Sequence, residues 1–296
     1  MSGTLISGRP GRRQRRRRRP LLTEAAATVL GVMLVIWSLT PVYNMILIAL
    51  DAEGDTEFSG NIWPPEPSLE SFRMVWTEGY WYLEHFWQRL GNSLYIGLLT
   101  MVLTVLIASL ASFAVGRMRL GKAWLLTDAA LLTYVVPASL LAIPFARVVQ
   151  GYGLSDNLWA VIAAEVMFAT PFSILILEQY ATLIPIELDE AARVDGASPL
   201  QVYLRIYLPL MAPALAAVGV YALLLAWGEY LYQYLLISSS RNWTVAIAIE
   251  QFFDSDEAPW NYMMATAIVY ALPPIAIFYT LRRYMVAGLS AGGLKG

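Results

Sequence analysis

The sequence predicts an all-α integral membrane protein with six transmembrane helices, and two features support this fold class. Hydrophobic residues make up 58% of the 296 residues, whereas Asp, Glu, Lys and Arg together make up 14%. An ordinary soluble domain carries about 25% charged residues. The second feature is a set of long apolar runs, since a spanning helix needs about 20 mostly apolar residues. The composition therefore excludes an ordinary soluble domain.

Six apolar runs are long enough to span a membrane. They cover Ala25–Leu50, Asn92–Gly116, Ala123–Val149, Asn157–Ala181, Leu210–Ile237 and Asn261–Leu281. Prolines interrupt several runs, which membrane helices tolerate when neighbouring helices satisfy the freed backbone groups. In the second run, small residues recur at spacings of three and four from Ala108 to Gly116. This spacing predicts close helix packing.

The distribution of Lys and Arg predicts that both termini lie in the cytoplasm. With the N-terminus inside, the inner segments hold all the bases except Arg73, Arg89, Arg147 and Arg241. Such an excess of bases is typical of cytoplasmic segments. The outer loops instead collect acidic residues, as in the loop 51–91. The sequence therefore predicts a multi-pass protein of the cytoplasmic membrane.

Residues 1–20 form an Arg-rich tail, with eight arginines among the first 19 residues. Such a run is compatible with nucleic-acid binding or with attraction to anionic lipid headgroups. We favour lipid as the partner and expect no nucleic acid. The apolar run that follows is longer than the h-region of a signal peptide, so we expect it to be retained.

The residue inventory offers little for catalysis or metal binding. The chain has no Cys and one His, His85, which excludes disulfides, thiolate nucleophiles and Cys-ligated metals. It also lacks the Gly-x-x-x-x-Gly-Lys-Ser/Thr phosphate loop of ATP-binding proteins. We therefore expect no catalytic residues, no metal and no cofactor bound by this chain.

The inner connection 184–209 carries the most specific pattern in the sequence. It predicts two short helices at the cytoplasmic surface, with Pro185 in the first turn of the first helix. Gly196 suits the left-handed residue after that helix, and Ser198-Pro199 suits the start of the second helix. Such a preformed element favours docking of a cytoplasmic partner.

A fixed set of residues in this connection resembles the EAA loop of the membrane subunits of bacterial ATP-binding-cassette (ABC) importers. The set is Glu190-Ala191-Ala192, Gly196, Ile206 and Leu208-Pro209. In that family the loop forms a coupling helix that sits in a cleft of the ATP-binding subunit. The resemblance implies that the ATPase-coupling residues are Glu190, Ala191, Ala192, Arg193, Asp195, Gly196, Ile206, Leu208 and Pro209.

Other segments are similar to the carbohydrate-importer branch, which contains the smaller membrane subunit of the maltose transporter. Trp227–Tyr230 resembles its Trp-Asn-Glu-Phe/Tyr stretch, with Gly228 in place of Asn. In the maltose system the C-terminal tail reaches the ATPase interface, and the loop corresponding to 238–260 contacts the binding protein. The implied tail contacts are Gly288, Leu289, Ser290, Ala291, Gly292 and Gly293.

The resemblance implies an importer-permease-type bundle, residues 21–281, followed by a cytoplasmic tail, residues 282–296. The implied function is permease subunit of an ABC importer for a carbohydrate or related polyol in the bacterial inner membrane. Its implied partners are a second permease subunit, two ATP-binding subunits that carry ATP and Mg, and an extracytoplasmic solute-binding protein. The alternatives are an ion- or proton-coupled secondary transporter and, with little support from the residues, a membrane-embedded enzyme.

Two acidic residues within the predicted spans, Glu165 and Glu229, are candidates for a substrate pathway. Ionisable groups at membrane depth are costly and usually face the interior of the bundle. Each carboxylate accepts hydrogen bonds from the hydroxyls of a polyol, bonds to a neighbouring helix or reaches toward the membrane interface. Trp227 and Tyr230 lie close to Glu229 in the sequence and would supply rings for stacking.

Overall fold

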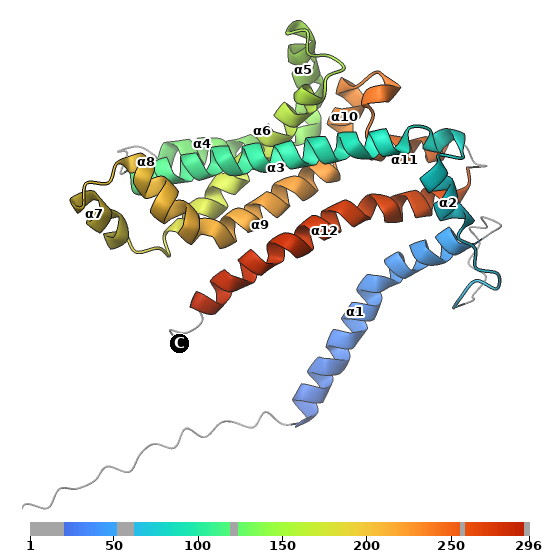
Figure 1. Cartoon of the computed structure of the whole chain (residues 1–296), viewed down its shortest axis with the longest axis horizontal. Helices are drawn as coiled ribbons and strands as arrows, with labels where there is room; N and C mark the ends of the chain where they lie inside the picture. The colour runs from blue at the N-terminus through green and yellow to red at the C-terminus, as the bar shows by residue number, and fades with distance from the viewer. Residues whose placement is uncertain (1–20, 52–61, 119–123, 255–257, 293–296) are drawn as a thin grey trace, which may run out of the picture. The chain divides into compact units, whose positions relative to one another are not determined.

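The structure, a computed structural model, describes residues 21–51, 62–118, 124–254 and 258–292. The Arg-rich tail 1–20 and residues 293–296 lie outside the described residues. Helices dominate the described part (Figure 1). They are α1 Leu21–Leu50, α2 Glu70–Thr77, α3 Phe86–Arg117, α4 Trp124–Leu132, α5 Ala138–Gly151, α6 Leu158–Ala181, α7 Glu187–Val194, α8 Pro199–Val202, α9 Leu208–Trp227, α10 Leu231–Leu236, α11 Val245–Glu250 and α12 Trp260–Gly292.

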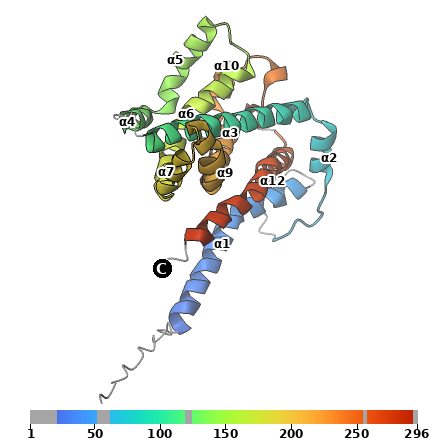
Figure 2. The same cartoon turned by 60° about the vertical axis from the view of Figure 1, so that its left-hand side comes forward.

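The chain divides into two units, residues 1–45 and 46–296. The described part of the first unit is most of α1, an apolar helix whose side chains are largely exposed. In the second unit, α3 packs along both α6 and α9, and α12 packs along α9 (Figures 1 and 2). These four helices form the frame that positions the candidate sites.

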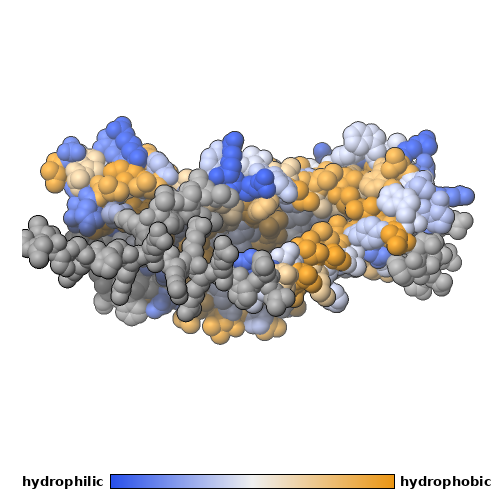
Figure 3. All heavy atoms as spheres, turned by 90° about the horizontal axis from the view of Figure 1, so that it is seen from below, coloured by the Kyte–Doolittle hydropathy of each residue, from blue (hydrophilic) through white to orange (hydrophobic). Residues whose placement is uncertain are grey.

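Apolar side chains also cover much of the visible surface (Figure 3). Leu106 and Leu110 on α3, and Leu140 and Ile143 on α5, are each more than 40% exposed. An apolar exterior of this extent is expected where a protein meets lipid or other subunits.

Among the described residues, five helices are long and apolar enough to cross a membrane by themselves. They cover Thr23–Leu50, Trp81–Arg117, Leu158–Ala181, Pro199–Trp227 and Trp260–Met285. The predicted first, second, fourth and sixth spans each fall on one of these helices, although three of the helices extend beyond the predicted bounds. The predicted small-residue packing is confirmed for Ala108, Ser109 and Ser112, which are buried in α3, but not for Gly116, which is exposed.

The predicted third span, Ala123–Val149, falls on a bent pair of helices and not on one continuous helix. Helical segments 128–135 and 138–151 meet at an angle of 101°. Pro137 is the N-cap of α5, and Val136 before it is extended, with φ −92° and ψ 120°. A residue that precedes proline is disfavoured in the helical region, so the helix breaks here.

The predicted fifth span, Leu210–Ile237, is wrong at both ends. Its helix begins at Pro199, passes through a π-helical turn at Tyr203–Tyr207 and ends at Trp227. Gly228 caps it, and α10 follows as a separate short helix. The second short helix expected in the inner connection is therefore the start of the fifth span.

The predicted boundary between the sixth span and the C-terminal tail, at residues 281 and 282, is not a helix end. Helix α12 continues to Gly292, although Pro273 and Pro274 lie inside it. At 1.5 Å per residue its 33 residues measure about 50 Å. That length exceeds the hydrocarbon core of a bilayer, which is about 30 Å thick.

Candidate functional site

Helix α7 and the turn after it have the local structure that the sequence predicts. Gly196 is left-handed, with φ +84°. The amide of Ala197 donates to the carbonyl of Ala192 (2.9 Å), and that of Gly196 donates to the carbonyl of Arg193 (3.1 Å). This pair of bonds is the Schellman motif, which closes a helix at a glycine.

The helix that follows starts with a capping box. The Ser198 side chain accepts from the amide of Gln201 (3.3 Å), and the Gln201 side chain accepts from the amide of Ser198 (2.7 Å). Pro199 occupies the first turn, as predicted. The expected place of Pro185 is wrong by two positions, because the N-cap of α7 is Ile186.

A buried ion pair fastens α7 to the end of α3. Arg117 and Asp189 are 3% and 1% exposed, and Arg117 Nη1 lies 3.4 Å from Asp189 Oδ2. Arg117 Nη2 also donates to the carbonyl of Ala181 at the end of α6 (2.8 Å) and to that of Ile184 in the turn that follows (2.9 Å). Arg193 Nη2 donates in turn to the carbonyl of Arg117 (3.3 Å). One guanidinium thus joins α3, α6 and α7.

Two hydroxyl pairs continue this attachment along α3. Ser109 Oγ lies 2.7 Å from the Tyr203 hydroxyl, and Ser112 Oγ lies 2.9 Å from the Tyr207 hydroxyl. Both tyrosines belong to the π-helical turn that leads into α9. Hydroxyl pairs of this kind fix the register of two packed membrane helices.

The predicted coupling residues divide into an exposed group and a partly buried group. Glu190, Ala191, Arg193, Asp195, Gly196 and Pro209 are exposed, whereas Ala192, Ile206 and Leu208 are half-buried. A groove of about 410 Å³ brings Ala192, Asp195, Gly196 and Ile206 together, beside Arg205. Leu208 and Pro209 begin α9 and do not line this groove.

The sequence reasoning missed Arg117 and gave Asp189 no specific role. Arg117 was counted among the inner bases, and nothing in its neighbours marks it as buried. Asp189 carried a weak signal. Helix α7 is amphipathic, and Asp189 is a charged residue on the face that packs against the rest of the protein.

A second candidate site is a cavity of about 260 Å³ between the two unpredicted helix breaks. The α4–α5 break contributes Tyr134 and Pro137, α6 contributes Glu165, and the α9–α10 break contributes Glu229 and Tyr232. The structure therefore brings the two predicted pathway carboxylates to one cavity.

The two carboxylates have different surroundings. Glu229 Oε1 accepts from the amide of Tyr232 (2.8 Å), and its Oε2 accepts from the amide of Gln233 (3.3 Å). Glu229 precedes the N-cap residue Tyr230, and its side chain satisfies two of the free amides in the first turn of α10. Glu165 is 1% exposed, and its Oε1 has no hydrogen-bond partner among the described residues.

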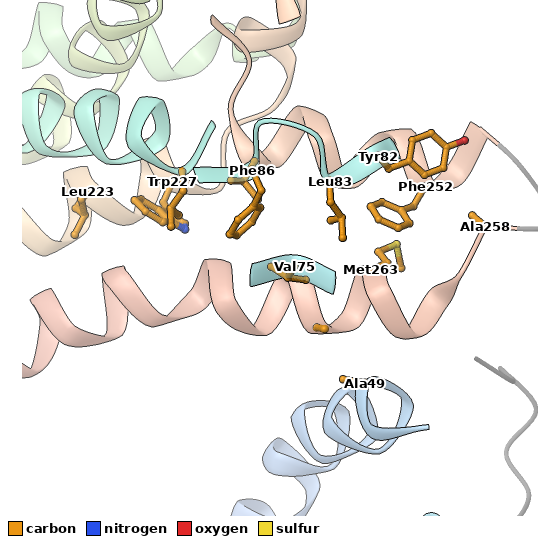
Figure 4. Close-up of a cluster of buried hydrophobic side chains, with 13 residues drawn as sticks. Ala49, Val75, Tyr82, Leu83, Phe86, Leu223, Trp227, Phe252, Ala258 and Met263 are labelled. Carbon is orange, nitrogen blue, oxygen red and sulfur yellow. The ribbon is translucent and has the colours of Figure 1, made fainter. Parts of the chain in front are cut away.

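Trp227 and Tyr230 do not line this cavity. Trp227 belongs to a hydrophobic cluster with Leu223 and Phe86 (Figure 4), and its ring stacks on Tyr270 with a centroid distance of 4.8 Å. Tyr230 stacks on Tyr234 at 5.4 Å. Gly288–Gly292 continue α12, whereas Gly293 lies outside the described residues.

The loop expected to meet a binding protein is held by Asp156. Asp156 Oδ1 accepts from the amides of Ser238 (3.0 Å) and Ser239 (2.9 Å) and from the Ser239 hydroxyl (3.0 Å). Burial opposes ionisation of Asp156, but these hydrogen bonds outweigh it and hold its pKa below the ordinary value. Asn92 of α3 supports the same loop by donating to the carbonyls of Arg241 and Trp243, both at 2.9 Å.

Comparison with known proteins shows the family of this chain. Residues 27–290 match the family described as binding-protein-dependent transport system inner membrane component. The trehalose transport system permease protein SugB of Mycobacterium tuberculosis is 31% identical, over 90% of this chain and 96% of the relative. The diacetylchitobiose uptake system permease protein DasC of Streptomyces coelicolor is 29% identical, over 94% and 100%.

A solved structure shares the fold. It is a bacterial ABC transporter involved in the import of the acidic polysaccharide alginate, and one of its chains superposes with a TM-score of 0.74. The match covers 90% of this chain and 98% of that chain, at 19% identity.

Proposed function

The chain belongs to the family of binding-protein-dependent transport system inner membrane components, and we propose that it serves as the permease subunit of an ABC importer for a carbohydrate or related polyol. The observation that carries this proposal is the match to two sugar-transport permeases over at least 90% of this chain. This membership decides against an ion-coupled transporter and against a membrane-embedded enzyme.

The proposed assembly contains a second permease subunit, two ATP-binding subunits that hold ATP and Mg, and an extracytoplasmic solute-binding protein. This chain forms half of the translocation pathway in the bacterial inner membrane, with both termini in the cytoplasm. The segment 238–260 meets the binding protein, and its attachment to Asp156 supports a fixed docking position.

Coupling to the ATP-binding subunits takes place through α7 and the turn at Gly196. The exposed side of this element, with Glu190 and Ala191, is available to a cytoplasmic partner. Its buried side carries Asp189, which contacts Arg117 of α3. A displacement of α7 therefore acts directly on α3, and it reaches α6 and the turn after it through the two carbonyls that Arg117 binds.

Helix α9 receives the same displacement through the backbone. After the turn at Gly196, an unbroken helix runs from Pro199 to Trp227. Packed elements move between discrete arrangements rather than deforming continuously. Closure of the ATP-binding subunits would thus move α3, α6 and α9 together and alternate the access of the pathway.

A second contact involves the end of α12. Because this helix is longer than the bilayer core is thick, its last turns extend beyond the hydrocarbon. This length supports the assignment of Gly288–Gly293 to a contact with the ATP-binding subunits.

The coupling assignment is tested with Glu190→Lys and Gly196→Asp in the complete transporter, reconstituted in proteoliposomes. Each variant is expected to insert normally but to abolish uptake of trehalose or diacetylchitobiose and the ATPase activity that uptake requires. Glu84→Lys is the control, since that side chain is 70% exposed and lies far along the chain from the coupling element. Normal uptake by Glu190→Lys would overturn the coupling assignment.

A further inference from the structure

We propose that the cavity between the two helix breaks is a subsite for one uncharged sugar ring, and that Glu165 accepts a hydrogen bond from a hydroxyl of that sugar. This inference rests on the proposed sugar-import function and deepens it, because it names the residue that contacts the solute and the class of solute that fits.

The protein itself leaves Glu165 Oε1 without a donor. The Tyr134 hydroxyl donates to the carbonyl of Phe168 (2.6 Å), and the Tyr232 hydroxyl donates to the carbonyl of Ala138 (2.7 Å). Thr133 Oγ1 is likewise committed to the carbonyl of Ala130 (2.6 Å). The three residues line the cavity, but each hydroxyl donates its proton to a backbone carbonyl and not to Glu165.

A buried polar atom without a partner is unfavourable, because the group loses its hydration and gains nothing in return. Glu165 is 1% exposed and Oε1 faces no donor from the described residues. The cavity beside it provides the space in which an occupant can supply that donor. A sugar hydroxyl is a donor of this kind.

The charge of the lining decides which sugars fit. Glu165 and Glu229 both line the cavity, and no Lys, Arg or His does. A sugar acid would bring a negative charge next to two carboxyl groups, and no cation in the lining would compensate it. Both Glu229 oxygens accept backbone amides, whereas Glu165 Oε1 has no hydrogen-bond partner among the described residues. A single acceptor suits a hydroxyl better than a metal cation, which takes several oxygen ligands.

The size and walls of the cavity favour a single ring. Its volume of about 260 Å³ lies below the 300–1,000 Å³ of typical small-molecule sites. Phe168 and Tyr232 line it, with ring centroids 5.1 Å apart, and give it an apolar wall for the CH face of a sugar. Glu229 is a positioning residue here, since its side chain holds the start of the helix that carries Tyr232.

Binding is tested on the complete transporter complex in nanodiscs without the binding protein, by saturation-transfer NMR. The probes are methyl glucoside, which is uncharged, glucuronate, which is anionic, and glucosamine, which is cationic. Methyl glucoside is expected to bind the wild type, and glucuronate is not. Glu165→Gln is expected to weaken methyl glucoside binding about 10-fold, because it replaces one carboxyl oxygen with an amide NH2 group, which donates but cannot accept a hydrogen bond.

The matched control is Glu178→Gln, which changes another glutamate of α6 about 20 Å along the helix. This variant is expected to bind methyl glucoside as the wild type does. Glu165→Leu removes the acceptor altogether and is expected to weaken binding further than Glu165→Gln. Thermal unfolding of each complex checks that the variant is folded. If Glu165→Leu does not fold, Glu165→Gln still tests the subsite, because it retains the volume of the side chain.

Three outcomes overturn the subsite. The first is equal binding of methyl glucoside by the wild type and a folded Glu165→Gln, and the second is binding of glucuronate as tight as that of methyl glucoside. The third is binding of glucosamine that is tighter than that of either other probe. The last result would assign the cavity to a cationic group. Sugar uptake with unchanged KM in Glu165→Gln would reject the subsite and leave the importer function standing. Absence of uptake for every sugar tested with the wild-type complex and its binding protein would instead reject the proposed function.

Discussion

Two buried carboxylates, Asp189 and Glu165, differ in what surrounds them. Both are 1% exposed. Asp189 lies 3.4 Å from the guanidinium of Arg117, at the junction of α3 and α7. Glu165 lies in α6 beside a cavity, and one of its oxygens has no partner among the described residues. A paired buried charge joins elements of the fold, whereas an unpaired acceptor beside a cavity suits a ligand.

Loss of a paired buried carboxylate and loss of an unpaired one are expected to have different energetic consequences. Removal of one partner from a buried ion pair leaves an uncompensated charge and is strongly destabilising. An acceptor that awaits a ligand has already been desolvated in the folded protein, so its loss affects binding more than folding. The predictions below separate these two cases and proceed from the largest expected effect to the smallest.

Asp189→Ala is expected to have the largest effect. It leaves Arg117 buried without its counter-ion, at a cost of about 3–5 kcal/mol. We expect a lower unfolding temperature of the complex and loss of coupled transport, because α7 loses its attachment to α3. Thermal unfolding and sugar-stimulated ATPase activity measure the two effects.

Two further variants sharpen this test. Glu187→Ala changes an exposed acid of the same helix and is expected to leave stability unchanged within about 0.5 kcal/mol. The double variant Arg117→Met with Asp189→Leu removes both charges and is expected to recover stability but not coupling, since apolar side chains often replace a buried pair without loss. Full stability of Asp189→Ala would show that the ion pair does not fasten α7.

Glu229→Ala is expected to have an intermediate effect. It removes the acceptor of two amides in the first turn of α10, at a cost of about 1 kcal/mol. The amides of Tyr232 and Gln233 should then exchange with solvent faster, as hydrogen exchange measured by mass spectrometry would detect. Glu165→Gln should leave that exchange unchanged, because these amides donate to Glu229 and not to Glu165. Equal loss of protection in both variants would contradict the division of roles between the two glutamates.

Acidification is expected to release the outer loop at Asp156, with the smallest effect. Because the folded pKa of Asp156 is lowered, its hydrogen bonds stabilise the loop above the ordinary pKa of about 3.9 and are lost as pH falls through the folded value. Amide exchange at Ser238 and Ser239 should therefore be constant from neutral pH to about pH 4 and faster below it, after correction for intrinsic rates. Asp156→Asn should lack this step, and a step of equal size in that variant would assign it to another group.

The lengths of the apolar runs predicted most of the spanning helices, because every span must cross a hydrocarbon core of the same thickness. Two of the errors lie where a helix breaks inside an apolar run. Pro137 and Gly228 stand in such runs, and apolarity alone does not distinguish a broken helix from a continuous one. These same breaks frame the cavity, so the local exceptions to the helical pattern define the candidate subsite.

The local structure of α7 and of the turn at Gly196 was predictable because its signals are local. A glycine after a helix and Ser-Pro before the next one fix backbone geometry over a few residues. The ion pair was not predictable, because Arg117 and Asp189 are 72 positions apart and each looks like an ordinary charge near a membrane surface. Pairing of distant residues depends on how α3, α6 and α7 pack.

The sequence by itself determined the membrane class, most of the spans and the helix–glycine–helix element, since hydrophobic length and turn chemistry act within short segments. The tertiary structure decided which charges are paired. It joined Asp189 to Arg117, placed Glu229 as the acceptor for amides in the first turn of α10 and left Glu165 beside a cavity without a donor. The physical reason is that the free energy of a buried charge depends on the groups that packing brings next to it, and these come from distant parts of the chain.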